Sequence, residues 1–250
     1  MKYHIFLLLL LFSLSYSLSA QDNRINEYAG IRFDKSLQFG AIKHSNGLGL
    51  NTQYLIQRKV NRLILFNYEI ISLKHPKESK VVNPIEDQAL PYVYGKRFSA
   101  IPMRFGAGNQ FIVADKETPS GIRISLNYHL GLDMTLLKPQ YLWITYYFPE
   151  TGRVKKLEKY DPENPVHANQ NNIFGGAAFY HGFTDLETVF GLYLKTSISF
   201  EWNDSEDQYK LIETGFMIDA FPEPLPIFAY IDNSNLFFNF FVSLSFGKRW

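Results

Sequence analysis

A histidine next to a serine is the first pair in this sequence that could carry out nucleophilic chemistry. His44 and Ser45 are adjacent, and Asn46-Gly47 follows them directly. Adjacent side chains on a strand point to opposite faces, so the two groups could not act together on one substrate. Asn-Gly is also a typical dipeptide of hairpin turns. The sequence therefore predicts a turn over 44–47 and not a catalytic pair.

Acidic and histidine residues that could support hydrolysis of a lipid or a peptide are scattered along the chain. The candidates are Asp115, Asp133, Glu187, Asp219, His75 and His181. None of them belongs to a motif of diagnostic spacing, and a Ser-His-Asp triad is defined by its geometry and not by its order in the sequence. An enzyme acting on lipid or peptide therefore stays an alternative hypothesis, with no predicted catalytic residue.

Oxygen-bearing side chains gather in the segment YDPENPVHANQNN (160–172), which holds Asp161, Glu163 and Asn164. Such groups can bind Ca²⁺, but the segment lacks the central Gly and the final Glu of a calcium-binding loop. We predict a solvated loop there. We therefore expect neither a metal nor a cofactor.

Strands must position all of these residues, because apolar and polar residues alternate over long stretches. Clear alternation covers 121–134, 189–202, 209–220 and 235–250, and weaker alternation covers 36–43, 48–57, 62–74, 97–105, 109–115 and 140–148. A helix would instead space its apolar residues three and four apart. The pattern predicts an all-β chain of about ten strands, although Pro102 weakens the prediction for 97–105.

The alternation does not by itself say which face meets water. A soluble barrel has an apolar interior, whereas a membrane barrel has an apolar exterior. The stretch 121–134 is far longer than the five or six residues of a usual strand, and aromatic residues crowd the predicted strand ends at Tyr92, Tyr94, 146–148, Trp202 and Trp250. These features favour a single antiparallel transmembrane β-barrel. A soluble periplasmic barrel that binds an apolar ligand is the alternative.

The polar rows would then line the inside of the barrel. They carry the residues that we predict to form a polar network in the lumen, which are Glu69, Arg123, His129, Asp133, Lys195, Glu201, Glu213 and Asp219. In a barrel this narrow, side chains fill most of the interior. We expect the charges to pair with one another.

The predicted connections fall into two groups by length. Segments 44–47, 116–120 and 221–234 are expected at one end with the long segments 75–96 and 149–187, and segments 58–61, 106–108, 137–139 and 203–207 are expected at the other. Barrels of the outer membrane have short periplasmic turns and long external loops. The apolar, glycine-rich stretch 173–183 in one long segment is expected to fold inward as a plug or to pack on the barrel rim.

The first residues of the chain indicate export. Lys2, the apolar run 5–12 and the small residues before Gln21 form the pattern of a signal peptide over 1–20, which would be removed. We therefore divide the chain into this peptide, an N-terminal segment over 21–35 and a barrel over 36–250. The formal net charge of +1 gives no sign of a nucleic-acid partner. Without cysteine, packing and backbone hydrogen bonds must hold the fold.

The last residues, FFNFFVSLSFGKRW (237–250), resemble the C-terminal strand signal that the barrel-assembly machinery reads, with Phe246 and Trp250 as its aromatic residues. Further stretches are KHPKE (74–78), PYVYGKRF (91–98), LLKPQYLWI (136–144), EKYDPE (158–163), NNIFGGAAFYHGF (171–183) and SFGKRW (245–250). Together they resemble an uncharacterised family of Bacteroidetes-type outer-membrane β-barrel proteins over nearly the whole mature chain. The resemblance implies a Gram-negative outer membrane, and it transfers no site residue.

The sequence therefore predicts a non-enzymatic outer-membrane barrel that acts as a structural protein, as a partner in an assembly or as a narrow path for a solute. Its expected partners are outer-membrane lipid, the assembly machinery during insertion and an envelope protein.

Overall fold

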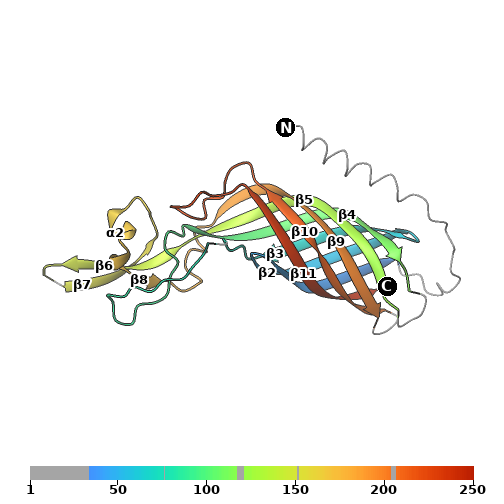
Figure 1. Ribbon diagram of the computed structural model, residues 1–250, viewed down its shortest axis with the longest axis horizontal. Coiled ribbons are helices and arrows are strands. Elements are labelled where there is room, and N and C mark those ends of the chain that lie inside the picture. The colour runs from blue at the N-terminus through green and yellow to red at the C-terminus, as the bar shows by residue number, and fades with distance from the viewer. Residues whose placement is uncertain (1–33, 76, 117–120, 151, 204–206) are drawn as a thin grey trace. The chain divides into compact units, whose positions relative to one another are not determined.

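The computed structural model describes residues 34–75, 77–116, 121–150, 152–203 and 207–250. The predicted signal peptide and the N-terminal segment up to residue 33 lie outside these residues. Eight strands close into a barrel in the order β1-β11-β10-β9-β5-β4-β3-β2, and every pairing between neighbours is antiparallel (Figure 1). The barrel strands are β1 (Lys35–His44), β2 (Gly47–Lys59), β3 (Arg62–Ile71), β4 (Phe98–Ala114), β5 (Arg123–Pro139), β9 (Glu187–Asn203), β10 (Gln208–Ala220) and β11 (Leu236–Arg249).

The first and last barrel strands pair with each other and close the sheet. Phe39 on β1 lies opposite Phe246 on β11, and Ser36 lies opposite Arg249. Closure leaves no strand of the barrel with an unpaired edge. The chain therefore forms the predicted all-β antiparallel barrel.

The barrel has eight strands and not the predicted ten, because two expected turns do not exist. Gly106 and Gly108 lie in the middle of β4, which joins the predicted strands 97–105 and 109–115 into one. Residues 137–139 form the end of β5, and the predicted strand 140–148 leaves the barrel. Pro102 pairs with Thr135 on β5, and the pairing on its other side is interrupted between Ile70–Met103 and Leu73–Ala100, where the missing N–H of proline is tolerated.

Losing the turn at 106–108 also moves one connection to the other end. β4 ends at Ala114 and β5 begins at Arg123 beside the turn that joins β2 to β3, since Phe111 on β4 lies opposite Arg62 on β3. Residues 117–120 of the predicted connection 116–120 lie outside the described residues, but the strand ends that it joins lie opposite the long loops, so its expected place with those loops was wrong. The long segments 72–97, 140–186 and 221–235 do share one end with the turn at 44–47, and we call this the loop end. The opposite end, with the short connections, is the turn end.

The polarity of the barrel is inverted relative to that of a soluble barrel. The row that includes Arg123, Asn127 and Asp133 is directed to the interior, and the row that includes Leu126, Leu130 and Leu132 is exposed on the outside. The same holds around the whole wall. Exposed apolar side chains on the other strands include Leu37, Phe39, Leu48, Leu50, Phe66, Ile70, Phe105, Val113, Phe190, Leu192, Leu194, Ile198, Phe200, Ile212, Phe216, Phe238, Phe240, Val242, Leu244 and Phe246.

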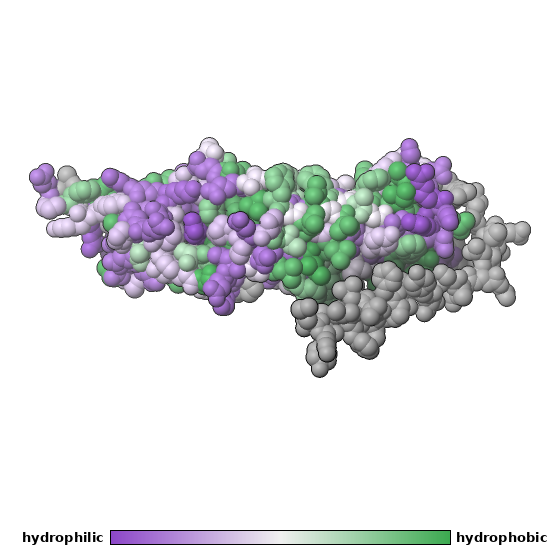
Figure 2. Space-filling view, turned by 90° about the horizontal axis from the view of Figure 1, so that it is seen from above, coloured by the Kyte–Doolittle hydropathy of each residue, from purple (hydrophilic) through white to green (hydrophobic). Residues whose placement is uncertain are grey.

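These outward rows form an apolar belt around the barrel. Figure 2 shows apolar surface over the barrel strands and hydrophilic surface toward both ends. On β9 the belt runs from Phe190 to Phe200. At about 3.3 Å per residue and a tilt of about 40°, this stretch spans roughly 25 Å along the barrel axis, which is about the height of the apolar band of outer-membrane barrels.

A small second sheet follows β5 at the loop end. It consists of β6 (Tyr141–Phe148), β7 (Gly152–Lys159) and β8 (Ile173–Gly176) in the order β7-β6-β8, and the short helices α2 (Pro165–Ala168) and η1 (Gln170–Asn172) precede β8. Its own buried core comprises Tyr92, Leu142, Ile144, Tyr160 and Ile173. The described residues contain no helix that is long and apolar enough to span a membrane.

Candidate functional site

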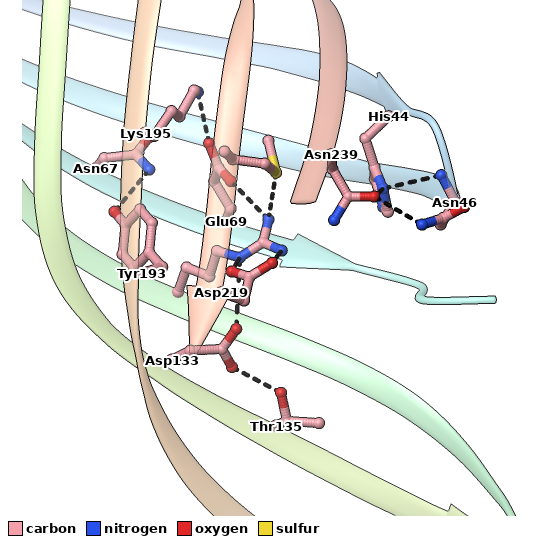
Figure 3. A network of polar contacts seen from close by, with 12 residues as sticks. His44, Asn46, Asn67, Glu69, Asp133, Thr135, Tyr193, Lys195, Asp219 and Asn239 are labelled. Atoms are coloured by element: carbon pink, nitrogen blue, oxygen red, sulfur yellow. Dashed lines mark hydrogen bonds and ion pairs between the residues drawn. The ribbon is translucent and has the colours of Figure 1, made fainter. Parts of the chain in front are cut away.

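The centre of the lumen is an ion cluster built around Arg104. The Arg104 guanidinium donates from Nε to Asp219 Oδ1 at 2.8 Å and from Nη2 to Asp219 Oδ2 at 2.7 Å. Its Nη1 donates to Glu69 Oε2 at 3.3 Å, and its Nε lies 3.5 Å from Asp133 Oδ2 (Figure 3). All four side chains are at most 2% exposed. One arginine from β4 thus joins carboxylates from β3, β5 and β10.

Lys195 on β9 extends this cluster toward the turn end. Its Nζ lies 2.7 Å from Glu69 Oε1 and 3.4 Å from Glu213 Oε1. Glu213 also accepts hydrogen bonds from Ser197 Oγ at 2.5 Å and from Gln53 Nε2 at 3.0 Å. Every charge of the cluster therefore has a partner, as burial of charge requires.

Tyr193 fills the space beside the cluster. Its hydroxyl accepts a hydrogen bond from Asn67 Nδ2 at 3.2 Å, and the Arg104 guanidinium lies 6.0 Å from its ring centroid. Gly106 makes room for this ring, because a Cβ at that position would lie 2.0 Å from the Tyr193 hydroxyl oxygen. The glycines at 106–108 thus serve close packing inside a strand, although their sequence suggests a turn.

A second ion cluster lies nearer the turn end. Arg249 near the C-terminus donates to Glu201, whose other carboxylate oxygen lies 3.0 Å from Lys116 Nζ. Arg123 binds Asp115 at 2.8 Å and lies 4.0 Å from Glu201. Asp115 lies just beyond β4, outside the barrel strands. There burial raises its pKa, but the hydrogen bond and charge of Arg123 outweigh burial and lower the pKa overall.

The loop end of the lumen is closed by an apolar cap. Its members from the strand ends and the adjoining positions are Phe98, Ala100, Leu137, Phe221 and Phe237, and its members from the loops are Leu73, Val93, Leu225, Ile227 and Phe228. All ten side chains are buried. Together with the two ion clusters, this cap gives the barrel a filled interior.

The structure divides the eight predicted lumen residues into three groups. Glu69, Asp133, Lys195, Glu213 and Asp219 meet in the central cluster, whereas Arg123 and Glu201 lie in the cluster at the turn end. His129 lies in the same interior row, opposite Lys195 on β9; it is fully buried, and neither ring nitrogen has a hydrogen-bond partner among the described residues.

Arg104 is the central residue that sequence reasoning missed. The predicted strand 97–105 contained Pro102 and ended before a predicted turn. Its last residues were therefore not assigned to the inner or the outer face of the barrel. The signal was present: Phe98, Ala100, Pro102 and Arg104 share one parity, and extending β4 through Gly106 places Arg104 opposite Asp133. Arg249 was also missed, although it shares the parity of the buried Ser243 and Ser245 on β11.

Of the residues considered for hydrolysis, Asp133 and Asp219 meet at Arg104 in the central cluster, but no candidate histidine lies with them among the described residues. His44 is buried inside the barrel with its Nδ1 3.3 Å from Asn239 Oδ1, whereas Ser45 is exposed and bonds to the backbone of Phe240. The turn predicted at 44–47 is present. Asp115 lies at the turn end, and His75 and His181 lie on different loops at the loop end. The described residues contain no cluster of three His, Asp or Glu side chains that could hold a metal.

The predicted loop 160–172 uses its polar side chains as helix caps. Asn164 Oδ1 accepts from Val166 N at 3.0 Å, and Asn169 Oδ1 accepts from Asn171 N at 3.1 Å. His167 Nε2 lies 2.9 Å from Glu158 Oε2 on β7. Burial raises the pKa of Glu158, but hydrogen bonds from Tyr146 and His167 outweigh it and lower the pKa overall.

The stretch 173–183 is not a plug. After β8 it packs on Lys138 of β5, whose Nζ lies 5.2 Å from the Phe179 ring centroid and donates to the His181 carbonyl at 3.1 Å. Phe179 and Tyr180 are each 70% exposed. Lys138 belongs to the outward row of β5, so this stretch packs on the barrel rim.

The two residues of the predicted assembly signal lie at the turn end of the wall. Phe246 is exposed in the outward row of β11, and Trp250 lies 6.3 Å from Tyr54 between ring centroids. Their role as a signal stays a prediction.

No protein-family model matches the chain, and no curated protein matches it. Among solved structures, the chain is similar to Neisserial surface protein A (NspA) at 11% identity and a TM-score of 0.43, over 87% of this chain and 97% of that one. It is also similar to Ail, the attachment invasion locus protein of Yersinia pestis, solved in complex with the heparin analogue sucrose octasulfate. That match has 10% identity and a TM-score of 0.43, and it covers 88% of this chain and 100% of Ail. The strand pairing of this chain establishes its barrel independently of these likenesses.

Proposed function

We propose that this protein is a non-enzymatic β-barrel of a Gram-negative outer membrane, with a sealed interior, that anchors its loop-end sheet for contact with an envelope partner. One observation carries the proposal: charged side chains fill the interior of the barrel, and apolar side chains cover its outside. In water such an exterior favours aggregation, whereas in lipid it is the stable arrangement. In a closed barrel the strands also hydrogen-bond the backbone N–H and C=O groups of one another, for which lipid offers no partners.

The orientation follows from the two ends. The turn end has short connections and would face the periplasm, and the loop end would face outward. The predicted signal peptide and the resemblance to Bacteroidetes-type barrels accord with export to this membrane.

A filled lumen favours an anchor over a solute path. Arg104, Glu69 and Lys195 cross the centre with no exposed surface, and the apolar cap lies above them. Opening a path would require breaking buried ion pairs, which costs several kcal/mol for each pair. Of the three non-enzymatic roles predicted from the sequence, the structural role and the assembly partner therefore fit best.

The loop-end sheet is the element that we propose to meet a partner. It has a core of its own, and β7 pairs only with β6, which leaves its outer edge available among the described residues. At the tip of the sheet Tyr147 is 76% exposed. Open strand edges and exposed aromatic side chains are common elements of protein interfaces.

Membrane placement and sealing can be tested on the full chain. We expect the protein in the outer-membrane fraction, with faster migration on a gel before boiling than after, because the closed barrel resists detergent. The purified barrel should show no steps of conductance in a planar bilayer. Recovery in the soluble fraction would contradict the membrane placement, and regular conductance steps would contradict the sealed lumen.

The proposed partner surface needs a separate test. A photo-crosslinking residue at Tyr147 should give a protein adduct in intact cells, whereas the same residue at the lipid-facing Phe240 should not. Equal adducts at the two positions, or none at either, would contradict a partner surface on this sheet.

A further inference from the structure

On the outer wall of the barrel, at the loop end, lies a pocket of about 270 Å³ that is separate from the lumen. It lies over the β1–β2 turn and the residues that follow β3. Its lining includes Lys43, Ser45, Leu48, Ser72, Lys74 and His75. Two lysines and one histidine line it, and none of the described lining residues is acidic, so its chemistry suits an anion.

Backbone hydrogen bonds hold the floor of this pocket. Lys74 N donates to Asn46 O at 2.7 Å, and Ser72 N donates to Leu48 O at 2.8 Å. The approach is so close that a Cβ on Gly47 would lie 1.7 Å from the Ser72 carbonyl oxygen. The two lysines are therefore carried by segments that are joined to each other, and the pocket is largely preformed.

The two lysines have no counter-ion within the part of the chain that the structure describes. Among the described residues neither Lys43 nor Lys74 lies within ion-pair distance of a carboxylate, and Glu78, the nearby acid on this loop, is paired with Lys96 at 2.9 Å. His75 Nδ1 accepts from Lys77 N at 3.2 Å, which leaves Nε2 as the ring nitrogen that carries hydrogen. Burial and the charge of Lys77 lower the pKa of His75, so a neutral ring that donates one hydrogen bond is favoured at neutral pH.

Position distinguishes this pocket from an ordinary basic surface. Lys43 lies opposite Leu48 on β2 and opposite Val242 on β11, and both of these side chains are exposed members of the apolar belt. Lys43 itself is exposed and continues the outward row that contains Leu37 and Phe39. A ligand here would meet cations at the border of an apolar surface. That combination fits an amphiphile with an anionic headgroup, and two lysines beside a donor ring match the charge and the several acceptor oxygens of a phosphate.

We propose that this pocket binds the phosphate headgroup of a lipid in the outer leaflet, with the acyl chains lying on the belt beside Leu48 and Val242. The inference rests on the proposed membrane placement. It adds to that placement a specific site on one side of the barrel, formed by Lys43, Lys74 and His75.

Native mass spectrometry of the detergent-solubilised barrel can test the site, with phosphatidic acid as the probe and phosphatidylcholine as the reference lipid. We expect the wild-type barrel to retain phosphatidic acid selectively, and Lys43→Gln/Lys74→Gln to lower that retention about tenfold, since two charge-assisted hydrogen bonds are lost. The matched control, Lys155→Gln/Lys156→Gln, removes the same charge at the same end of the barrel and should retain the lipid. Lys43→Arg/Lys74→Arg should also retain it.

Three results would overturn the proposal. The first is equal retention by wild type and Lys43→Gln/Lys74→Gln, and the second is an equal loss in the control pair, which would show only a general charge effect. The third is displacement of the lipid by millimolar inorganic phosphate, which would show a site for the free anion. A gel of the same samples, unboiled and boiled, reports the barrel separately. A heat shift without selective retention refutes the lipid site alone, whereas the absence of a heat shift refutes the membrane barrel on which it rests.

Discussion

Arg104 on β4 and Asp219 on β10 bind each other through two hydrogen bonds, 2.8 Å and 2.7 Å long, although the two strands are not neighbours in the sheet. The pair therefore crosses part of the lumen, because β9 and β5 separate β10 from β4 in the sheet. Bidentate arginine–carboxylate contacts fix orientation as well as distance. This one contact both fills the channel and joins strands that backbone hydrogen bonds do not connect.

Replacing Arg104 by Met should destabilise the barrel by about 3–5 kcal/mol, because Asp219, Glu69 and Asp133 would lose their shared cation in a buried site. The temperature at which the gel heat shift occurs should fall accordingly. The control is Lys156→Met on the loop-end sheet, which removes a charge outside the barrel. It should change the stability of the barrel by no more than about 0.5 kcal/mol. Equal transition temperatures for Arg104→Met and wild type would show that the cluster does not stabilise the fold.

Gly106→Ala should destabilise the barrel by about 1–3 kcal/mol through overpacking, since the new methyl group would lie 2.0 Å from the Tyr193 hydroxyl oxygen. The free energy of unfolding in urea measures this effect. Tyr193→Phe removes this hydroxyl oxygen. The double variant Gly106→Ala/Tyr193→Phe should therefore recover part of the stability that Gly106→Ala loses. Ala107→Val, at the next position and on the outward face, is the control and should be close to neutral. Strict additivity of Gly106→Ala and Tyr193→Phe would argue against the steric explanation.

The loop-end sheet should loosen in acid through Glu158. The folded-state pKa of this group lies below the ordinary value of 4.5, because hydrogen bonds from Tyr146 and His167 outweigh its burial. A lowered pKa contributes stability that is present above pH 4.5 and is lost as the pH falls through the folded value. Trp143 on β6 can report this change by fluorescence in a Trp202→Phe/Trp250→Phe background. We expect its emission to change below pH 4.5, and we expect Glu158→Gln to abolish the dependence. An unchanged titration in Glu158→Gln would assign the effect to another group.

The predicted assembly signal can be separated from simple contact with lipid. Phe246→Ser/Trp250→Ala should lower the amount of heat-modifiable barrel in cells severalfold, while the purified variant still refolds in detergent. Phe240→Ser removes an aromatic side chain from the same outward row of β11 and serves as the control. A similar decrease in both variants would mean that lipid contact, and not recognition by the assembly machinery, explains the effect.

Alternation in the sequence was enough to predict strands and to sort their residues onto two faces. Seven residues of the predicted lumen network are buried, from Glu69 on β3 to Asp219 on β10, and the partly buried Arg123 shares the inward row of β5. The predicted turn at 44–47 is present as well, with Ser45 and Asn46 at its centre and Gly47 as the first residue of β2. These features depend on neighbouring residues alone, and a sequence records neighbours directly.

The number of strands and the partners of the charges were decided only in three dimensions. Gly106 resembles a turn residue in the sequence, but it lies inside β4. Glycine is required there because Tyr193 from β9 occupies the space that a larger side chain would need. Arg104 became central because β4 passes through that glycine and meets carboxylates from three other strands. A period of two residues assigns a face to each side chain, but it carries no information about which strand lies across the lumen. That information arises only when the barrel closes and sets the register of all eight strands at once.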